Sequence, residues 1–160
     1  MDDEVLHGYL QHHWVGSTAG VSLFQRVARS HGDPAAATVV GELGEEVAGE
    51  RETLRGLMTA VGVRPSRVGA LAARAGEVAG RLKPNGRVLS RSPLTDVLEL
   101  EALRDAVYGK RGGWEVLRSV ADDDPRLDAA LLDDLLARSD RQLERLQGLH
   151  VGVSRKRLLA

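Results

Sequence analysis

Apolar residues recur along most of the chain at alternating steps of three and four, the spacing that places one apolar stripe on one face of an α-helix. One such stripe includes Val40, Leu43 and Val47. No stretch alternates apolar and polar residues in the way that a half-buried strand requires. The pattern therefore predicts an all-α protein with helices over residues 3–31, 35–62, 67–82, 93–121 and 127–153.

Three pairs of residues indicate where helices begin. Asp33-Pro34, Ser92-Pro93 and Asp124-Pro125 each place a capping side chain directly before a proline suited to the first helical position. Glycines at Gly32 and Gly62 are suited to helix ends. These signals agree with the helix boundaries that the apolar pattern predicts.

The unequal connections predict the topology. Short loops join the first two long helices and the last two, so each pair is expected to form an antiparallel hairpin. Residues 63–92 lie between the pairs and are numerous enough to run back along the bundle as a long crossover that carries the short fifth helix. We expect one domain over residues 1–153 and a basic tail over residues 154–160.

Two hairpins joined by one long crossover form the arrangement of the ferritin-like superfamily, which this chain resembles. The stretch Gly-Arg-Leu-Lys-Pro-Asn-Gly-Arg at 80–87, Arg-Ser-Pro-Leu at 91–94 and Leu-Glu-Leu-Glu at 98–101 are similar to its actinobacterial members in particular. The resemblance covers nearly the whole chain and implies a ferritin-like four-helix bundle. It is a likeness of topology and says little about activity.

Each long helix carries polar residues near its middle, inside or beside its apolar stripe. They are His13, Glu50, Arg104 and Gln142, and counting from the helix ends places them at similar depth. We expect them to form one buried polar layer in which Glu50 is charged and hydrogen-bonded to His13 or to an arginine of the helix predicted over residues 93–121. Arg111 is the alternative arginine partner.

In metal-binding members of the ferritin-like superfamily this layer holds carboxylates on two helices and a Glu-x-x-His motif on each of the other two. Here the first helix offers His13, and the fourth offers Glu101-x-x-Arg104. An arginine in the layer supplies the positive charge that a metal would bring. We therefore expect no metal and no cofactor, with one ion at His13 and Glu50 or a dinuclear centre as the alternatives.

Composition narrows the function classes further. The absence of cysteine excludes disulfides and thiolate metal sites and is typical of a reducing, cytoplasmic setting. Residues 5–25 carry no Asp, Glu, Lys or Arg, yet their histidines and hydroxyl residues make them too polar for a membrane span, so no membrane association is expected. No metalloprotease, serine-hydrolase or phosphate-loop motif occurs, which disfavours these enzyme classes.

Charge is distributed unevenly. Residues 1–62 have 9 acids and 4 bases, residues 63–92 have 1 acid and 7 bases, and residues 93–160 have 13 acids and 11 bases. The basic crossover either docks on the acidic bundle or contacts an acidic protein or phosphate-bearing ligand. The candidate contact residues are Arg81, Lys83, Arg87 and Arg91. Nucleic acid is disfavoured, because the flanking acidic segments would repel phosphates and the crossover has no aromatic residue for stacking.

Two functions follow from these patterns. The first is a non-catalytic interaction or scaffold protein whose basic crossover is the contact surface. The second is a metal-binding or redox enzyme that uses the reduced central ligand set. The run Gly16-Ser17-Thr18-Ala19-Gly20 permits close helix contact and adds the expectation of either a central helix or a homodimer face.

Overall fold

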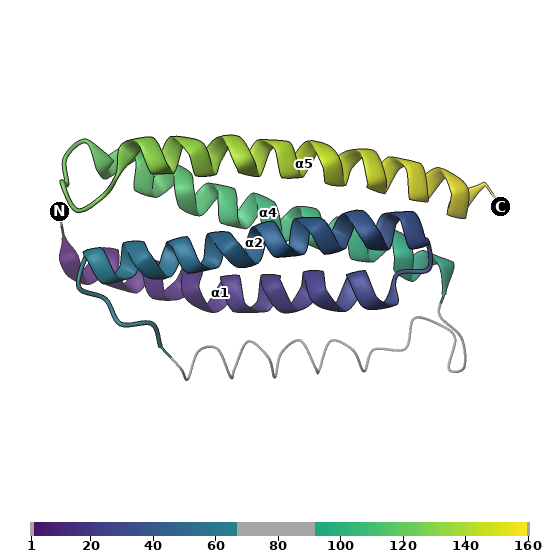
Figure 1. The fold of residues 1–160 in the computed structure, drawn as a ribbon, viewed down its shortest axis with the longest axis horizontal. Helices are drawn as coiled ribbons and strands as arrows, with labels where there is room; N and C mark the ends of the chain where they lie inside the picture. Colours follow the sequence, from purple (N-terminus) through teal and green to yellow (C-terminus); the bar gives the residue numbers. More distant parts are fainter. Residues whose placement is uncertain (1, 67–91, 160) are drawn as a thin grey trace.

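The computed structural model describes residues 2–66 and 92–159, which form a bundle of long α-helices (Figure 1). The helices are α1 (Asp3–Ser30), α2 (Pro34–Ala60), α4 (Pro93–Ala121) and α5 (Ala129–Leu158). The described residues contain no strand, and the prediction of an all-α bundle is confirmed for this part of the chain. The helix expected over residues 67–82, and most of the crossover, lie outside the described residues.

Helices α2 and α4 run in the same direction along the bundle (Figure 1). Near the start of α1, His7 Nε2 lies 3.2 Å from the carbonyl oxygen of Val61, the residue that follows α2. Arg126, which follows α4, donates to Asp3 at 2.7 Å at the same end of the bundle. The carboxyl ends of α2 and α4 therefore both lie beside the amino end of α1.

The helix starts at Pro34 and Pro93 are as predicted, and the start at Asp124-Pro125 is wrong. Residues 122–128 are a loop, and α5 begins at Ala129, where the Asp128 side chain accepts from the backbone N–H of Leu131. Asp124 instead accepts from the backbone N–H of Arg126 at 3.0 Å. A capping side chain before proline fits a turn as well as a helix start, and here the ion pair between Asp124 and Arg126 favours the turn.

The last helix also ends later than residue 153. Residues 154–158, expected as part of a basic tail, continue α5. Lys156 Nζ donates to Asp33 at 2.8 Å, and an Arg157 guanidinium nitrogen donates to Asp96 at 2.7 Å. These contacts attach the last turn to the α1–α2 loop and to the start of α4, which is why the helix does not fray there.

His31 is the residue that follows α1, and its side chain is buried. Its Nδ1 accepts from the backbone N–H of Asp33 at 3.1 Å. Its Nε2 lies 3.3 Å from the carbonyl oxygen of Asp96 and, in that tautomer, donates to it. The imidazole therefore links the α1–α2 loop to α4.

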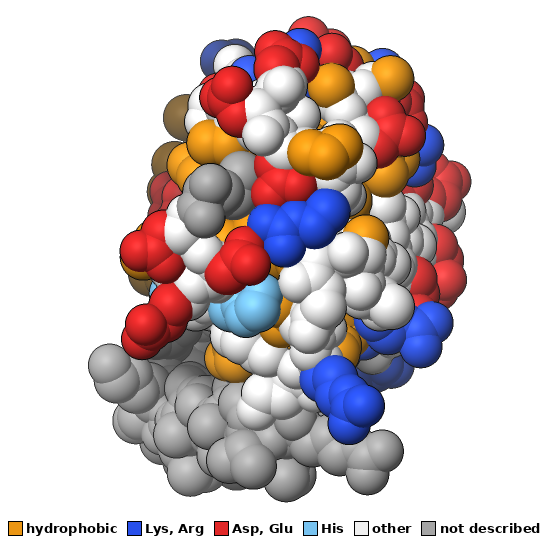
Figure 2. All heavy atoms as spheres, turned by 90° about the vertical axis from the view of Figure 1, so that its left-hand side faces the viewer, with side chains coloured by type: hydrophobic (Ala, Val, Ile, Leu, Met, Phe, Trp, Pro, Cys, Tyr) orange, Lys and Arg blue, Asp and Glu red, His pale blue; other side chains and the backbone are white. Residues whose placement is uncertain are grey.

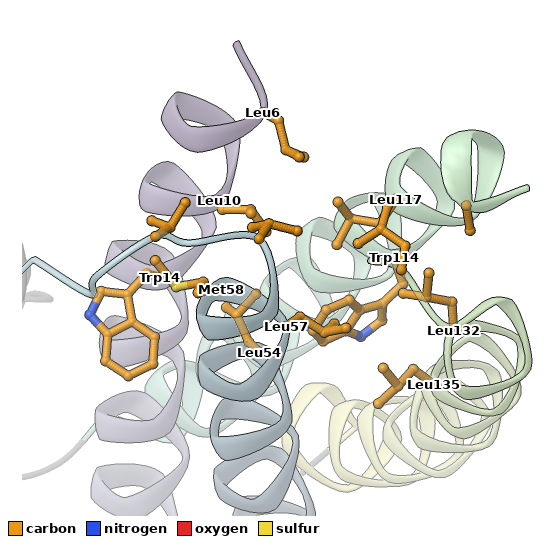
Figure 3. Close-up of a cluster of buried hydrophobic side chains, with 14 residues drawn as sticks. Leu6, Leu10, Trp14, Leu54, Leu57, Met58, Trp114, Leu117, Leu132 and Leu135 are labelled. Carbon is orange, nitrogen blue, oxygen red and sulfur yellow. The ribbon is translucent and has the colours of Figure 1, made fainter. Parts of the chain in front are cut away.

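The apolar side chains form two separate clusters along the bundle. In the cluster nearer the amino end of α1, side chains from all four helices converge, with Trp114 and Leu117 of α4 facing Leu57 of α2 and Leu132 and Leu135 of α5 (Figure 3). The second cluster also draws on all four helices, around Phe24, Leu43, Leu100 and Leu146. Buried polar side chains lie at the level between the two clusters.

The end of the bundle where α1 begins is polar on its surface. Acidic and basic side chains lie next to one another across it (Figure 2). Arg126 illustrates the pairing, since its guanidinium lies 2.7 Å from Asp3 and 2.6 Å from Asp124. The pair with Asp3 is exposed and contributes little to stability, whereas the Asp124 carboxylate is buried. The ion pairs lie at the end of the apolar cluster drawn in Figure 3, and the residues of that cluster stay buried.

Two neighbouring glycines of α4 give a matched test of how closely α1 and α4 pack. A Cβ at Gly113 would lie 2.8 Å from ring atoms of His13, whereas no atom lies within 4 Å of a Cβ at Gly112. We expect Gly113→Ala to lower the free energy of unfolding by about 1–3 kcal/mol through overpacking. Gly112→Ala should raise it by about 0.5–1 kcal/mol through helix propensity. Urea denaturation of both variants measures this, and equal effects would contradict the packing described here.

Candidate functional site

Two oppositely charged side chains, Glu50 and Lys110, are in direct contact at the centre of the bundle. Glu50 of α2 is 1% exposed, and the Lys110 ammonium of α4 donates to its Oε2. Lys110 also donates to Gln142 Oε1 of α5 at 2.5 Å, while Gln142 Nε2 donates to Glu50 Oε1 at 2.9 Å. The three side chains thus form a closed ring of hydrogen bonds contributed by three helices.

A chain of polar contacts connects this ring with the surface between α2 and α5. Gln142 Nε2 also donates to Glu46 Oε2 at 3.0 Å. Arg145 in turn donates to Glu46 at 2.9 Å and to Glu42 at 2.5 Å. The buried pair is therefore the inner end of a network that lies along the α2–α5 interface.

The structure corrects the expected partner of Glu50. Neither Arg104 nor Arg111 reaches it: Arg104 Nη1 lies 2.9 Å from His150 Nδ1, and Arg111 pairs with Asp140 and Glu115. Lys110 occupies the central position in place of both. His150 is half-buried beside Arg104.

Two signals in the sequence point to Lys110. The apolar stripe of α4 passes from Val107 to Trp114, and the position three after Val107 and four before Trp114 is Lys110. Counting from the two helix starts gives the same answer, because Glu50 lies 16 residues after Pro34 and Lys110 lies 17 after Pro93. Counting through the loop after α4 gives a different level, because the last helix is predicted to begin at residue 127 and begins at Ala129. The earlier predicted start shifts the expected level on α4 away from Lys110 and toward Arg104.

His13 lies at this level but outside the ring. Its imidazole packs 4.5 Å from the ring of Tyr9 and against the backbone of Gly113, and the hydrogen bonds of Glu50 described above go to Lys110 and Gln142. Burial lowers the pKa of His13, and the neighbouring charge of His12 lowers it further. His13 is therefore a neutral imidazole at pH 7.

A cavity of about 250 Å³ lies beside the ring, between α1, α2 and α4. Its walls are mostly apolar and include Leu10, Phe24, Val47, Leu54, Val107 and Trp114. Glycines contribute the space, since Gly16 and Gly20 of α1 face the cavity together with Gly109 and Gly113 of α4. The run of residues 16–20 predicts close helix contact, whereas in the structure Gly16 and Gly20 border a cavity.

Polar groups line the cavity at a few positions. Glu50 and Lys110 line it from α2 and α4, and His13 lines it from α1. Arg51 also lines it, with its guanidinium carbon 3.7 Å from the centroid of the Trp14 ring and one nitrogen 3.1 Å from Thr18 Oγ1. A mostly apolar cavity with a few fixed polar groups is the usual form of a small-molecule site.

The residues of this layer do not fit a metal centre of the ferritin-like type. Both carboxylate oxygens of Glu50 already accept hydrogen bonds, and the Lys110 ammonium lies where a cation would have to bind. His13 is not paired with a second metal-binding side chain at this position. Within residues 2–66 and 92–159 no group of three His, Cys, Asp or Glu side chains is arranged to hold an ion.

The basic contact residues predicted in the crossover lie outside the described residues. They are Arg81, Lys83, Arg87 and Arg91. Of the preceding connection, residues 64–66 rest on α1, where the Gln11 side chain donates to the carbonyl oxygen of Arg64 at 2.6 Å and accepts from the backbone N–H of Ser66 at 3.0 Å.

Comparison with known proteins found no matching family model, no matching curated protein and no matching solved structure. Among the helices that the structure describes, none combines the length and the apolar character that crossing a membrane requires.

The ion pair between Glu50 and Lys110 predicts how a set of variants should rank in free energy of unfolding. Lys110→Ala should lower the free energy of unfolding by about 3–5 kcal/mol, because it leaves the charge of Glu50 buried without its counter-ion. The double variant Glu50→Met, Lys110→Met should recover most of that loss, since no buried charge remains. Arg104→Ala is the matched comparison and should cost less, as its partner is the half-buried His150. Urea denaturation of the set measures the order, and an equal loss for Arg104→Ala and Lys110→Ala would contradict it.

The lowered pKa of His13 predicts a pH dependence. The imidazole has an ordinary pKa of 6.5, and in the folded protein the value is lower because of burial and then of His12. As the pH falls below 6.5, the unfolded chain takes up a proton at His13 before the folded chain does, so the free energy of unfolding falls. His13→Gln should remove this component. NMR titration of the His13 ring gives the pKa directly, and a midpoint above 6.5 would contradict the prediction.

Proposed function

We propose that the protein is a ferritin-like helical bundle that acts by binding rather than by catalysis, and that the cavity between α1, α2 and α4 binds a small, mostly apolar molecule. The observation that carries the proposal is the cavity of about 250 Å³ with apolar walls and a charged pair at one side. Such a space would be filled by side chains if the bundle served stability alone, because protein interiors are close-packed.

The ferritin-like part of the proposal is supported by the order and direction of the helices. Two hairpins are present, α2 and α4 run in the same direction, and a polar layer lies near the middle of the bundle. The binding role is supported by the chemistry of that layer. Its cation is the ammonium group of Lys110, which lies beside Glu50 where a metal ion would have to bind.

The basic crossover and a homodimer remain part of the proposed function as an interaction protein. A segment with 7 bases and 1 acid beside an acidic bundle favours an acidic protein or a phosphate-bearing partner. The cavity and this segment are independent features, so the test of the small-molecule site does not depend on what the crossover binds.

Cinnamyl alcohol, an aromatic ring with one hydroxyl group, is a suitable probe for the cavity. We expect it to bind the protein with one-to-one stoichiometry and a negative heat-capacity change in calorimetry, and to change the fluorescence of Trp114 in the cavity wall. Gly109→Leu places a side chain in the cavity lining, where no atom lies within 4 Å of the added Cβ, and should weaken binding by about tenfold or more.

The matched control is Gly148→Leu on α5. Gly148 is exposed, does not line the cavity and also has no atom within 4 Å of an added Cβ. This variant should bind the probe as the wild type does. Equal binding by the Gly109→Leu and Gly148→Leu variants, or no binding by the wild type, would exclude the cavity as the site.

A further inference from the structure

We propose that Lys110 is a nucleophile that forms a Schiff base with an aldehyde bound in the cavity, with Glu50 as its proton acceptor and counter-ion. The inference rests on the proposed binding function, because it takes the same cavity as the site. It assigns a chemical class to the ligand: an apolar molecule that carries one reactive carbonyl group.

The position of Lys110 carries the inference. Its side chain lines the cavity and is 16% exposed, so a molecule bound there is beside the amine. The groups that act on its charge come from each neighbouring helix. They are Glu50 and Glu46 of α2 and Arg138 and Gln142 of α5. From α1, the neutral His13 lines the same cavity.

Burial also makes the amine a better nucleophile than an ordinary lysine. Desolvation lowers the pKa of Lys110, and this effect outweighs the opposite influence of Glu50. A larger fraction of the side chain is therefore neutral at a given pH. Desolvation in an apolar pocket is the usual way in which proteins activate a lysine for attack on a carbonyl group.

The reaction balances without any further reactant. Glu50 takes one proton from the Lys110 ammonium, and the amine nitrogen attacks the carbonyl carbon to form a carbon–nitrogen bond. The carbonyl oxygen takes a second proton from the attacking nitrogen and becomes a hydroxyl group. It then accepts the proton that Glu50 returns and leaves as water, as the nitrogen lone pair forms the carbon–nitrogen double bond. The product is a protonated imine, so one positive charge is present before and after the reaction.

The surroundings suit this product. The imine nitrogen keeps one N–H, which can remain paired with Glu50, so the buried carboxylate is never left without a counter-ion. Gln142 still donates to Glu50 Oε1. The apolar walls limit the access of water, which slows hydrolysis of the imine.

The chain provides its own reference for the test, because it contains 3 lysines, Lys83, Lys110 and Lys156. Lys156 is 70% exposed and does not line the cavity. We suggest incubating the wild-type protein with cinnamaldehyde, reducing any imine with borohydride and mapping the modified lysine by mass spectrometry. The adduct adds the mass of the aldehyde less one oxygen atom.

We expect modification at Lys110 to exceed that at Lys156 by about tenfold or more. An excess of cinnamyl alcohol, which fills the cavity but cannot form an imine, should suppress modification at Lys110 and leave Lys156 unchanged. The Gly109→Leu variant should lose the excess at Lys110, and the Gly148→Leu variant should keep it. Modification of Lys110 at or below the level of Lys156, or modification that the alcohol does not suppress, would overturn the inference.

The results separate the two proposals. If cinnamyl alcohol binds as expected and Lys110 is not preferentially modified, the cavity is a binding site and the lysine is only part of its wall. If neither occurs, the proposed function fails as well. Because every comparison is made within the folded wild-type chain or between the two glycine variants, no substitution of the buried pair is needed.

Discussion

The charge of Glu50 is the constraint on which the middle of the bundle depends. A carboxylate that is 1% exposed loses nearly all of its hydration, a cost of several kcal/mol that only close, well-directed partners can offset. Lys110 and Gln142 provide those partners from α4 and α5. All three hydrogen bonds of the ring form only when α2, α4 and α5 have one particular alignment along the bundle axis. The ring therefore specifies the register of these helices, which interchangeable apolar contacts do not do.

This ring also divides the core. Apolar side chains pack in two clusters, one toward the amino end of α1 (Figure 3) and one around Phe24, Leu43 and Leu100. Between them the ring borders the cavity, where Gly16 and Gly20 of α1 and Gly109 of α4 supply no side chain to fill the space. The cavity therefore lies where the polar layer meets the glycines of α1 and α4, and its position follows from both.

The ends of the bundle complete this arrangement. At one end Asp96 accepts from the backbone N–H of Gly32 at 3.0 Å and from Arg157 at 2.7 Å, which joins the α1–α2 loop, α4 and α5. At the other end Arg126 joins Asp3 and Asp124. With both ends connected, the helices that border the cavity are held in place without close packing in the cavity itself. The proposed binding role requires such a cavity, with walls that the surrounding helices hold in place.

Local sequence determined the all-α character, the number of long helices in the described residues and the starts at Pro34 and Pro93, because helix periodicity and capping act over a few neighbouring residues. It also indicated that Glu50 and Gln142 would lie at a common buried level. Helix periodicity allows Lys110 at this level, and the tertiary structure decided that it pairs with Glu50 in place of Arg104 or Arg111. The tertiary structure alone decided that Asp124-Pro125 is a turn, that α5 continues to Leu158 and that glycines line a cavity. These features depend on the relative height of helices distant in sequence, and a shift of one or two residues in a loop changes that height without changing any local pattern.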